Sequence, residues 1–113
     1  MKSRIVLVVT LIAMLSLGLS SGVMAQDEVT SVCLVSDIGR VNDGSFNQST
    51  YEGMLRAAAD FNLDNTYIET QAQTDYEANL QTCIDNGYDI IVVVGFLITD
   101  AAVAAAKANP EVQ

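Results

Sequence analysis

The residues best suited to chemistry lie in one polar segment, Asp37 to Gln48, which reads DIGRVNDGSFNQ. Asp37 supplies a carboxylate that can accept two hydroxyl hydrogen bonds. Asn47 supplies both a donor and an acceptor, which suits a base edge or a sugar hydroxyl. Phe46 offers a flat face for stacking, and a helix that begins here would add free N–H groups. Together these groups suit the binding of a small molecule that carries a ring and hydroxyls.

A structural interpretation explains the same residues without a ligand. In it Ser45 caps a helix, Phe46 packs in the core as a staple, and the Asp and Asn residues form turns. On periodicity alone this interpretation is the better one. The choice between the two therefore depends on the rest of the chain.

The other reactive residue types argue against an enzyme. The chain has no His and two Cys, so neither a nucleophile–base pair nor a zinc-type ligand set stands out. The glycines after the first predicted strand do not form a G-x-G-x-x-G or Walker pattern. We therefore expect no catalytic site, no metal and no cofactor.

Strands and helices are expected to alternate along the chain. Apolar runs rich in β-branched residues predict strands over residues 29–35, 66–68 and 90–95. Helices are predicted over residues 45–61, 74–86 and 99–109, the first two beginning with the capping boxes S-x-x-Q and T-x-x-E. Gly87 stands where a left-handed C-cap is expected. The third strand is a continuous apolar run, which predicts burial on both faces.

The first helix carries apolar residues at three- and four-residue spacing, which predicts a single buried stripe. Its members are Phe46, Tyr51, Met54, Leu55, Ala58 and Phe61.

The β-α-β-α-β-α order predicts an α/β fold with a doubly wound parallel sheet and right-handed crossovers. In such sheets ligands bind at the carboxyl ends of the strands. The loops after the first and third strands are therefore expected at the mouth of the site. They contain Ser36, Asp37, Asn42, Asp43, Asn47, Gly95, Phe96 and Asp100. Residues 111–113 resemble the start of a fourth strand, so we expect the chain to be part of a longer fold.

The first 25 residues have the features of a secretory signal peptide. Two basic residues precede an uncharged apolar run over residues 5–19, and small residues end in Val-Met-Ala before Gln26. The apolar run is shorter than the roughly twenty residues that span a bilayer. We expect cleavage after Ala25, with an uncleaved membrane anchor as the alternative. Cys33 lacks a convincing lipobox, which predicts release outside the cytoplasm without a lipid anchor.

The part after residue 25 is strongly acidic, with a net charge of −11, because it contains all fourteen acids and only three basic residues, Arg40, Arg56 and Lys107. Nucleic acids and anionic lipids bind through Lys and Arg. We therefore expect neither as a partner.

Cys33 and Cys83 are the only cysteines, in a chain expected in an oxidising space. Cys33 is early in the first predicted strand, and Cys83 is near the end of the second predicted helix, which runs antiparallel to the strands. Both are therefore expected at the end of the sheet opposite the ligand site. If the first and third strands are neighbours, a disulfide between them closes a loop of about fifty residues. We favour the disulfide, subject to its Cα separation rule, over two buried free thiols.

The stretch from Asp37 to Gly53, DIGRVNDGSFNQSTYEG, resembles the signature of the basic membrane protein family of ABC-transporter solute-binding proteins, the group similar to purine nucleoside receptors. That signature reads D-x-G-x-x-(D/N)-D-x-S-F-N-Q-x-x-(W/Y)-x-G. Residues 74–77, 89–96 and 108–110 also resemble segments of this family. The similarity covers nearly all of the chain after residue 25.

The resemblance implies a type 1 periplasmic-binding-protein fold, in which two α/β lobes close on a ligand. Residues 26–113 would be part of the N-terminal lobe, with the second lobe missing. The implied function is the extracytoplasmic capture of a nucleoside, purine nucleosides in particular, for delivery to an ABC permease. Fold analogy alone does not identify the ligand.

The resemblance also implies roles for individual residues. Asp37 and Asn47 would hydrogen-bond the ligand, with Asp43 beside them. Phe46 would stack on the base, and Gly95 and Phe96 would line the cleft. Arg40 departs from the family, which usually has a small residue here, and would place a cation near the mouth of the cleft.

Two alternatives from other classes stay open. One is the extracellular sensor domain of a signalling receptor, with residues 5–19 kept as an anchor. The other is a flavodoxin-like enzyme, which the missing nucleophile–base pair makes the less favoured of the two.

Overall fold

A parallel three-stranded sheet lies at the centre of the structure, a computed structural model that describes residues 28–113. The elements in chain order are β1 (Ser31–Ile38), α2 (Phe46–Phe61), β2 (Asp64–Thr70), the 3-10 helix η1 (Gln73–Asp75), α3 (Tyr76–Asp85), β3 (Ile90–Val94) and α4 (Thr99–Ala108). The strand order is β2-β1-β3, with both pairings parallel. The expected α/β class and parallel sheet are confirmed. The predicted signal peptide, residues 1–25, lies outside the described residues.

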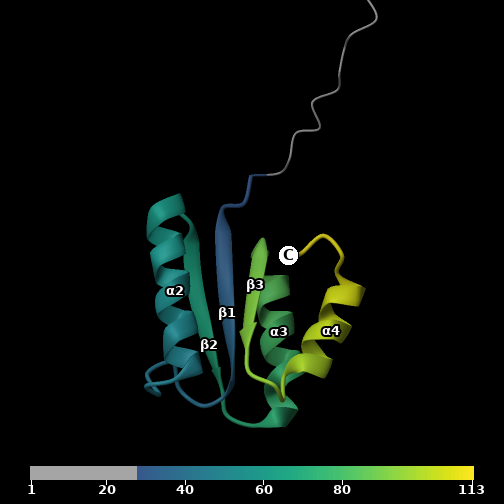
Figure 1. The fold of residues 1–113 in the computed structure, drawn as a ribbon. Coiled ribbons are helices and arrows are strands. Elements are labelled where there is room, and N and C mark those ends of the chain that lie inside the picture. Colours follow the sequence, from purple (N-terminus) through teal and green to yellow (C-terminus); the bar gives the residue numbers. More distant parts are fainter. Residues whose placement is uncertain (1–27) are drawn as a thin grey trace, which may run out of the picture.

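Helices cover both faces of the sheet: α2 lies on one face, and α3 and α4 lie on the other (Figure 1). The central strand β1 alternates its side chains between the two layers. Val32 and Leu34 pack in the cluster that contains Met54 of α2. Cys33 and Val35 pack in the cluster formed with α3 and the residues leading into α4. All four β1 side chains are buried, so this strand belongs to two cores at once.

The ends of α3 differ in how well the sequence anticipates them. The expected T-x-x-E capping box is not formed, because residues 73–75 make a 3-10 turn and α3 begins only at Tyr76. At the other end Gly87 has a φ of 74° and donates its N–H to the carbonyl of Ile84 at 2.9 Å. The left-handed C-cap is therefore confirmed. None of the helices within residues 28–113 is long and apolar enough to cross a membrane.

β3 is an edge strand of the described sheet, and the expected burial of this strand on both faces is wrong. Val93 is 36% exposed, and an apolar groove of about 280 Å³ lies beside it, lined also by α3, α4 and Val112. A continuous apolar run does not distinguish a central strand from an edge strand. The neighbours in the sheet decide how much of it is covered.

The last residue of the chain pairs with the outer edge of β3. Gln113 donates its N–H to the carbonyl of Asp89 at 3.0 Å and accepts from the N–H of Ile91 at 2.8 Å. This is the hydrogen-bond pattern of a parallel ladder. It agrees with the expectation that residues 111–113 begin a fourth strand.

The apolar stripe predicted for α2 is only partly buried. Met54 and Ala58 are buried against the sheet, and the Tyr51 ring meets the Tyr67 ring edge-on with 4.8 Å between centroids. Phe61, at the last turn, is 75% exposed, so its assignment to the core is wrong. Helical spacing alone therefore does not identify which apolar residues of α2 are covered.

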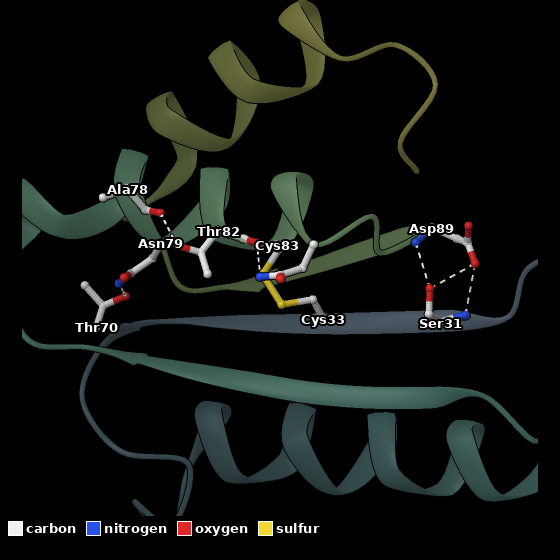
Figure 2. The surroundings of a disulfide bond; sticks show 9 residues. Ser31, Cys33, Thr70, Ala78, Asn79, Thr82, Cys83 and Asp89 are labelled. Atoms are coloured by element: carbon white, nitrogen blue, oxygen red, sulfur yellow. Dashed lines mark hydrogen bonds between the residues drawn. A yellow bond between two sulfur atoms is a disulfide. The ribbon is translucent and has the colours of Figure 1, made fainter.

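A disulfide joins Cys33 of β1 to Cys83 of α3, with 6.0 Å between their Cα atoms (Figure 2). β1 and β3 are neighbours in the sheet, as the predicted disulfide requires. Close by, Ser31 of β1 and Asp89 are joined by hydrogen bonds, including one from the Ser31 hydroxyl to the Asp89 carboxylate at 3.0 Å. Both contacts lie toward the amino end of β1, away from the loops expected to bind ligand.

Reduction of Cys33–Cys83 is expected to destabilise the fold by about 4 kcal/mol, because the bond closes a loop of fifty residues. Denaturant unfolding with and without a phosphine reductant measures this difference. The Cys33→Ala/Cys83→Ala variant serves as a matched control, since its stability should not depend on the reductant. Equal stability of the oxidised and reduced wild type would contradict the prediction.

Candidate functional site

The carboxyl ends of β1 and β3 open into a cleft of about 550 Å³. The loops that lead from β1 into α2 and from β3 into α4 lie at this end of the sheet (Figure 1). The cleft is lined by Asp37, Ile38, Asp43, Ser45, Phe46, Asn47, Val94, Gly95, Phe96 and Leu97. All six residues that the sequence singled out for ligand binding are in this set.

Asp37 lines the cleft and is held by hydrogen bonds from three parts of the chain. Its Oδ1 accepts from the Tyr76 hydroxyl of α3 and from the N–H of Ile38 at 2.7 Å. Its Oδ2 accepts from the N–H of Leu97 at 2.9 Å, which ties the loop after β3 to the end of β1. A carboxylate has about four acceptor sites. Oδ1 accepts two of these bonds and Oδ2 accepts one, so Oδ2 is the oxygen with more capacity for a further donor.

The contact with Tyr76 contributes to the pKa shifts of both groups. Burial raises the pKa of Asp37, but hydrogen bonds from Tyr76 and from the backbone of Ile38, Leu97 and Phe96 outweigh it and hold that pKa below its ordinary value. Burial, the same hydrogen bond and the charge of Asp37 raise the pKa of Tyr76 to about 12. At neutral pH the pair is an ionised carboxylate and a neutral phenol.

Gly95 allows the loop after β3 to approach Asp37. Its φ is 115°, which other residues rarely adopt, and a Cβ at this position would collide with the Asp37 side chain. Gly39 plays a similar part on the other side, since a Cβ there would lie 3.0 Å from the Asn47 amide nitrogen. Two glycines therefore leave room for the two polar side chains of the cleft.

Asn47 is buried, with only 7% of its surface exposed, yet it lines the cleft. Among residues 28–113 its amide makes no side-chain hydrogen bond, and none of its atoms is both fully buried and unpartnered. Its unpartnered amide atoms therefore reach the cleft, where they keep a free donor and a free acceptor. The part of Asn47 that reaches the cleft is thus available to a ligand.

Phe46 and Phe96 carry exposed rings at the cleft, 76% and 88% exposed. The interpretation of Phe46 as a core staple is therefore wrong. Phe46 is the first residue of α2, and little of its ring is covered by residues 28–113. Leu97 and Ile38 are also exposed there, although the sequence did not single them out.

Asp43 lines the cleft but also caps α2. Its Oδ1 accepts from the N–H groups of Ser45 at 2.8 Å and Gln48 at 3.2 Å, and its Oδ2 accepts from the Ser45 hydroxyl. The expected S-x-x-Q capping box is therefore wrong: the Ser45 side chain makes no cap, and Gln48 reaches back to Gly44. A carboxylate two residues before Ser45 competes better for the free N–H groups than a hydroxyl does.

Four residues named for the mouth of the cleft or its rim lie outside its lining: Ser36, Arg40, Asn42 and Asp100. The Ser36 hydroxyl is buried, accepting from Thr70 N–H and donating to the Gly39 carbonyl. Arg40 is turned toward β2, with Nε 4.0 Å from Glu69 Oε2. The cation that departs from the family pattern thus faces away from the cleft.

Tyr76 also contributes to the site, although the sequence did not predict a role for it there. It lies between the two candidate loops in the chain, at the start of α3, and its hydroxyl reaches Asp37 only through the packing of α3 on β1. Within residues 28–113, no group of three or more His, Cys, Asp or Glu side chains could hold a metal ion.

Asp43→Asn is expected to lower the melting temperature by a few degrees at neutral pH, since the cap loses its charge. Hydrogen bonds, the Ser45 N–H foremost, lower the pKa of Asp43 in the fold. Its contribution is therefore present above the ordinary aspartate pKa and is lost as the pH falls through the lowered folded value. Thermal unfolding from about pH 7 to about pH 2 should show the two proteins converging in acid. A constant difference would mean that the charge of Asp43 has no part in the cap.

Comparison with known proteins gives consistent relatives. A family model described as "ABC transporter substrate-binding protein PnrA-like" matches residues 30–113. The chain is 32% identical to the ABC transporter nucleoside-binding protein BmpA of Lactococcus lactis subsp. cremoris, over 98% of this chain and 35% of that protein. It is 28% identical to basic membrane protein A of Borreliella burgdorferi, over 98% of this chain and 32% of that protein.

Among solved structures, an ABC transporter system solute-binding protein from Aeropyrum pernix K1 matches with a TM-score of 0.67 and 30% identity. The match covers 74% of this chain and 23% of that one. The chain thus spans about a third or less of the length of these relatives. The match of the family model over nearly all of the described residues shows that the chain belongs to the PnrA-like family of ABC transporter substrate-binding proteins.

Proposed function

We propose that the chain forms the N-terminal lobe of an extracytoplasmic solute-binding protein that captures a nucleoside, a purine nucleoside in particular, for an ABC importer. The observation that carries the proposal is the side-chain amide of Asn47, which reaches the cleft without a hydrogen-bond partner within residues 28–113, together with the exposed rings of Phe46 and Phe96 in the same cleft. A nucleoside combines the three chemistries that such a cleft can bind: a flat base, polar base edges and sugar hydroxyls. The relative from Lactococcus lactis is named as nucleoside-binding, which supports the same ligand class.

Each polar group of the cleft takes a role that fits its remaining hydrogen-bond capacity. Asn47 donates to and accepts from the edge of the base. Asp37 accepts a hydroxyl hydrogen bond at Oδ2, the oxygen with more remaining capacity. Asp43 has its carboxylate engaged in the cap of α2, so its part is to hold Phe46 and Asn47 in the first turn of that helix. None of these roles involves bond breaking, in keeping with a binder that is not an enzyme.

The exposed rings also support a second lobe. Phe46 stacks on the base from this lobe, and Phe96 lines the opening of the cleft. Burial of such exposed rings by a ligand and a second surface removes much apolar area from water and so stabilises the closed complex. The relatives are about three times as long as this chain, which leaves room for a second α/β lobe that closes over the ligand.

Delivery requires that the protein leave the cytoplasm and meet a permease. Residues 1–25 serve as a cleaved signal peptide in this proposal, and the released protein carries its ligand to the ABC permease. The net charge of −11 after residue 25 disfavours nucleic acid as a partner.

Ligand binding is tested with the secreted protein encoded by the complete reading frame that contains this chain. A purine nucleoside at about a hundred times its dissociation constant should stabilise the fold by about 2.7 kcal/mol, seen as a rise in melting temperature. Asn47→Ala and Phe46→Ala should each weaken binding by about tenfold or more, because each removes one recognition element.

Phe61→Ala is the matched control for Phe46→Ala, since Phe61 is an equally exposed ring at the opposite end of α2. It should leave the affinity unchanged. Free ribose, riboflavin and pyrimidine nucleosides complete the panel. The absence of any shift with every nucleoside would rule out the proposed ligand and leave the family assignment in place.

Export is tested by the N-terminal sequence of the protein recovered from outside the cytoplasm. We expect Gln26 as the first residue, because the small-residue pattern Val-Met-Ala ends at Ala25. A retained Met1, or an N-terminus at a lipid-modified Cys33, would contradict release by signal cleavage after Ala25.

A further inference from the structure

We propose that Tyr76 is a positioning residue of the ligand site: it fixes the Asp37 carboxylate so that Oδ2 faces the ligand hydroxyl. The inference rests on the proposed function. It adds a residue from α3 to a site otherwise built from the loops after β1 and β3.

Tyr76 bonds the carboxylate that lines the cleft, but Tyr76 itself is not part of the lining. The Tyr76 hydroxyl donates to Oδ1, which also accepts from the N–H of Ile38. Tyr76 is buried and is absent from the cleft lining, while Asp37 is part of it. Tyr76 therefore does not contact a ligand in the cleft and acts on it through Asp37.

The rest of α3 explains why the Tyr76 hydroxyl stays in place. Tyr76, Leu80 and Cys83 lie on one face of the helix, and all three are buried in one cluster. Cys83 is bonded to Cys33. Cys33, Val35 and Asp37 occupy every second position of β1, the spacing of residues that share one face of a strand. α3 is thus attached to β1 at two points, a disulfide at one end and the Tyr76–Asp37 hydrogen bond at the other.

Without Tyr76, one of the two direct donors to Oδ1 is lost, and the carboxylate gains freedom to rotate. The bonds from Ile38 and Leu97 both come from backbone N–H groups at the rim of the cleft. Tyr76 is the one direct side-chain donor to Asp37 among residues 28–113. Loss of the Tyr76 hydroxyl therefore weakens the hydrogen bond from the ligand hydroxyl to Oδ2, which depends on the direction of that oxygen. Stacking of the base on Phe46 is unaffected.

The test is a thermodynamic cycle of purine-nucleoside affinity, measured by calorimetry on the protein of the complete reading frame. Its four members are the wild type, Tyr76→Phe, Asp37→Ala and the double variant. Tyr76→Phe should weaken binding by roughly tenfold in the wild-type background and by less than about twofold in the Asp37→Ala background. A merely structural role would give similar losses in both backgrounds.

A second readout compares the nucleoside with its free purine base, which has no sugar hydroxyl. Tyr76→Phe should lower the affinity for the nucleoside and leave the affinity for the base unchanged. A general loosening of the cleft would lower both affinities. Tyr88→Phe is the matched control, because Tyr88 packs on the same core cluster beyond the other end of α3. It should leave both affinities unchanged, and melting temperatures check that every variant is folded.

The outcomes separate this inference from the function on which it rests. Wild-type protein that binds no nucleoside would remove the proposed function, and the positioning role with it. Wild-type binding that Tyr76→Phe leaves unchanged, or weakens equally for nucleoside and base, would overturn the positioning role alone.

Discussion

The burial of β1 on both faces is the constraint on which the rest of the structure depends. Its side chains alternate between α2 on one side and α3 with α4 on the other, so a single strand joins two cores. The disulfide from Cys33 to Cys83 adds a covalent bond to one of these contacts. Because both layers pack against β1, the loops at its carboxyl end have defined positions relative to both.

Those loops concentrate polar groups where the sheet ends. The Asp37 carboxylate, the Asp43 carboxylate and the Asn47 amide lie within one cleft, but they are not equivalent. The two carboxylates are largely occupied by backbone N–H groups and by the Tyr76 and Ser45 hydroxyls, which lower the pKa of each. Asn47 has no such partners among the described residues, so it is the group with the most hydrogen-bonding capacity left for a ligand.

The cleft combines closely packed polar side chains with exposed aromatic rings. Asp37 and Asn47 need room, which Gly95 and Gly39 provide by lacking a Cβ. Phe46 and Phe96 instead extend into solvent, although rings of this size are usually covered. Exposed rings beside a polar cleft are typical of a surface that is completed by a ligand or by another part of the protein.

The order of elements, the parallel sheet and the cleft at the ends of β1 and β3 could be predicted from the sequence by itself. Alternating apolar patterns and turn residues are local signals, and the doubly wound rule then places the polar loops together. The same reasoning and the family signature singled out six residues for ligand binding, and all six line this cleft.

Tertiary structure alone decided which side chains are covered and which polar groups meet. Phe61 and Val93 carry the apolar pattern of core residues, but Phe61 is exposed and Val93 lines an open groove with residues of α3 and α4. Arg40 turns toward Glu69, away from the cleft. Asp43 replaces Ser45 as the cap of α2, and Tyr76 reaches Asp37 across 39 residues of sequence. Burial and hydrogen-bond partners depend on segments distant in the chain, and spacing within one segment carries no information about them.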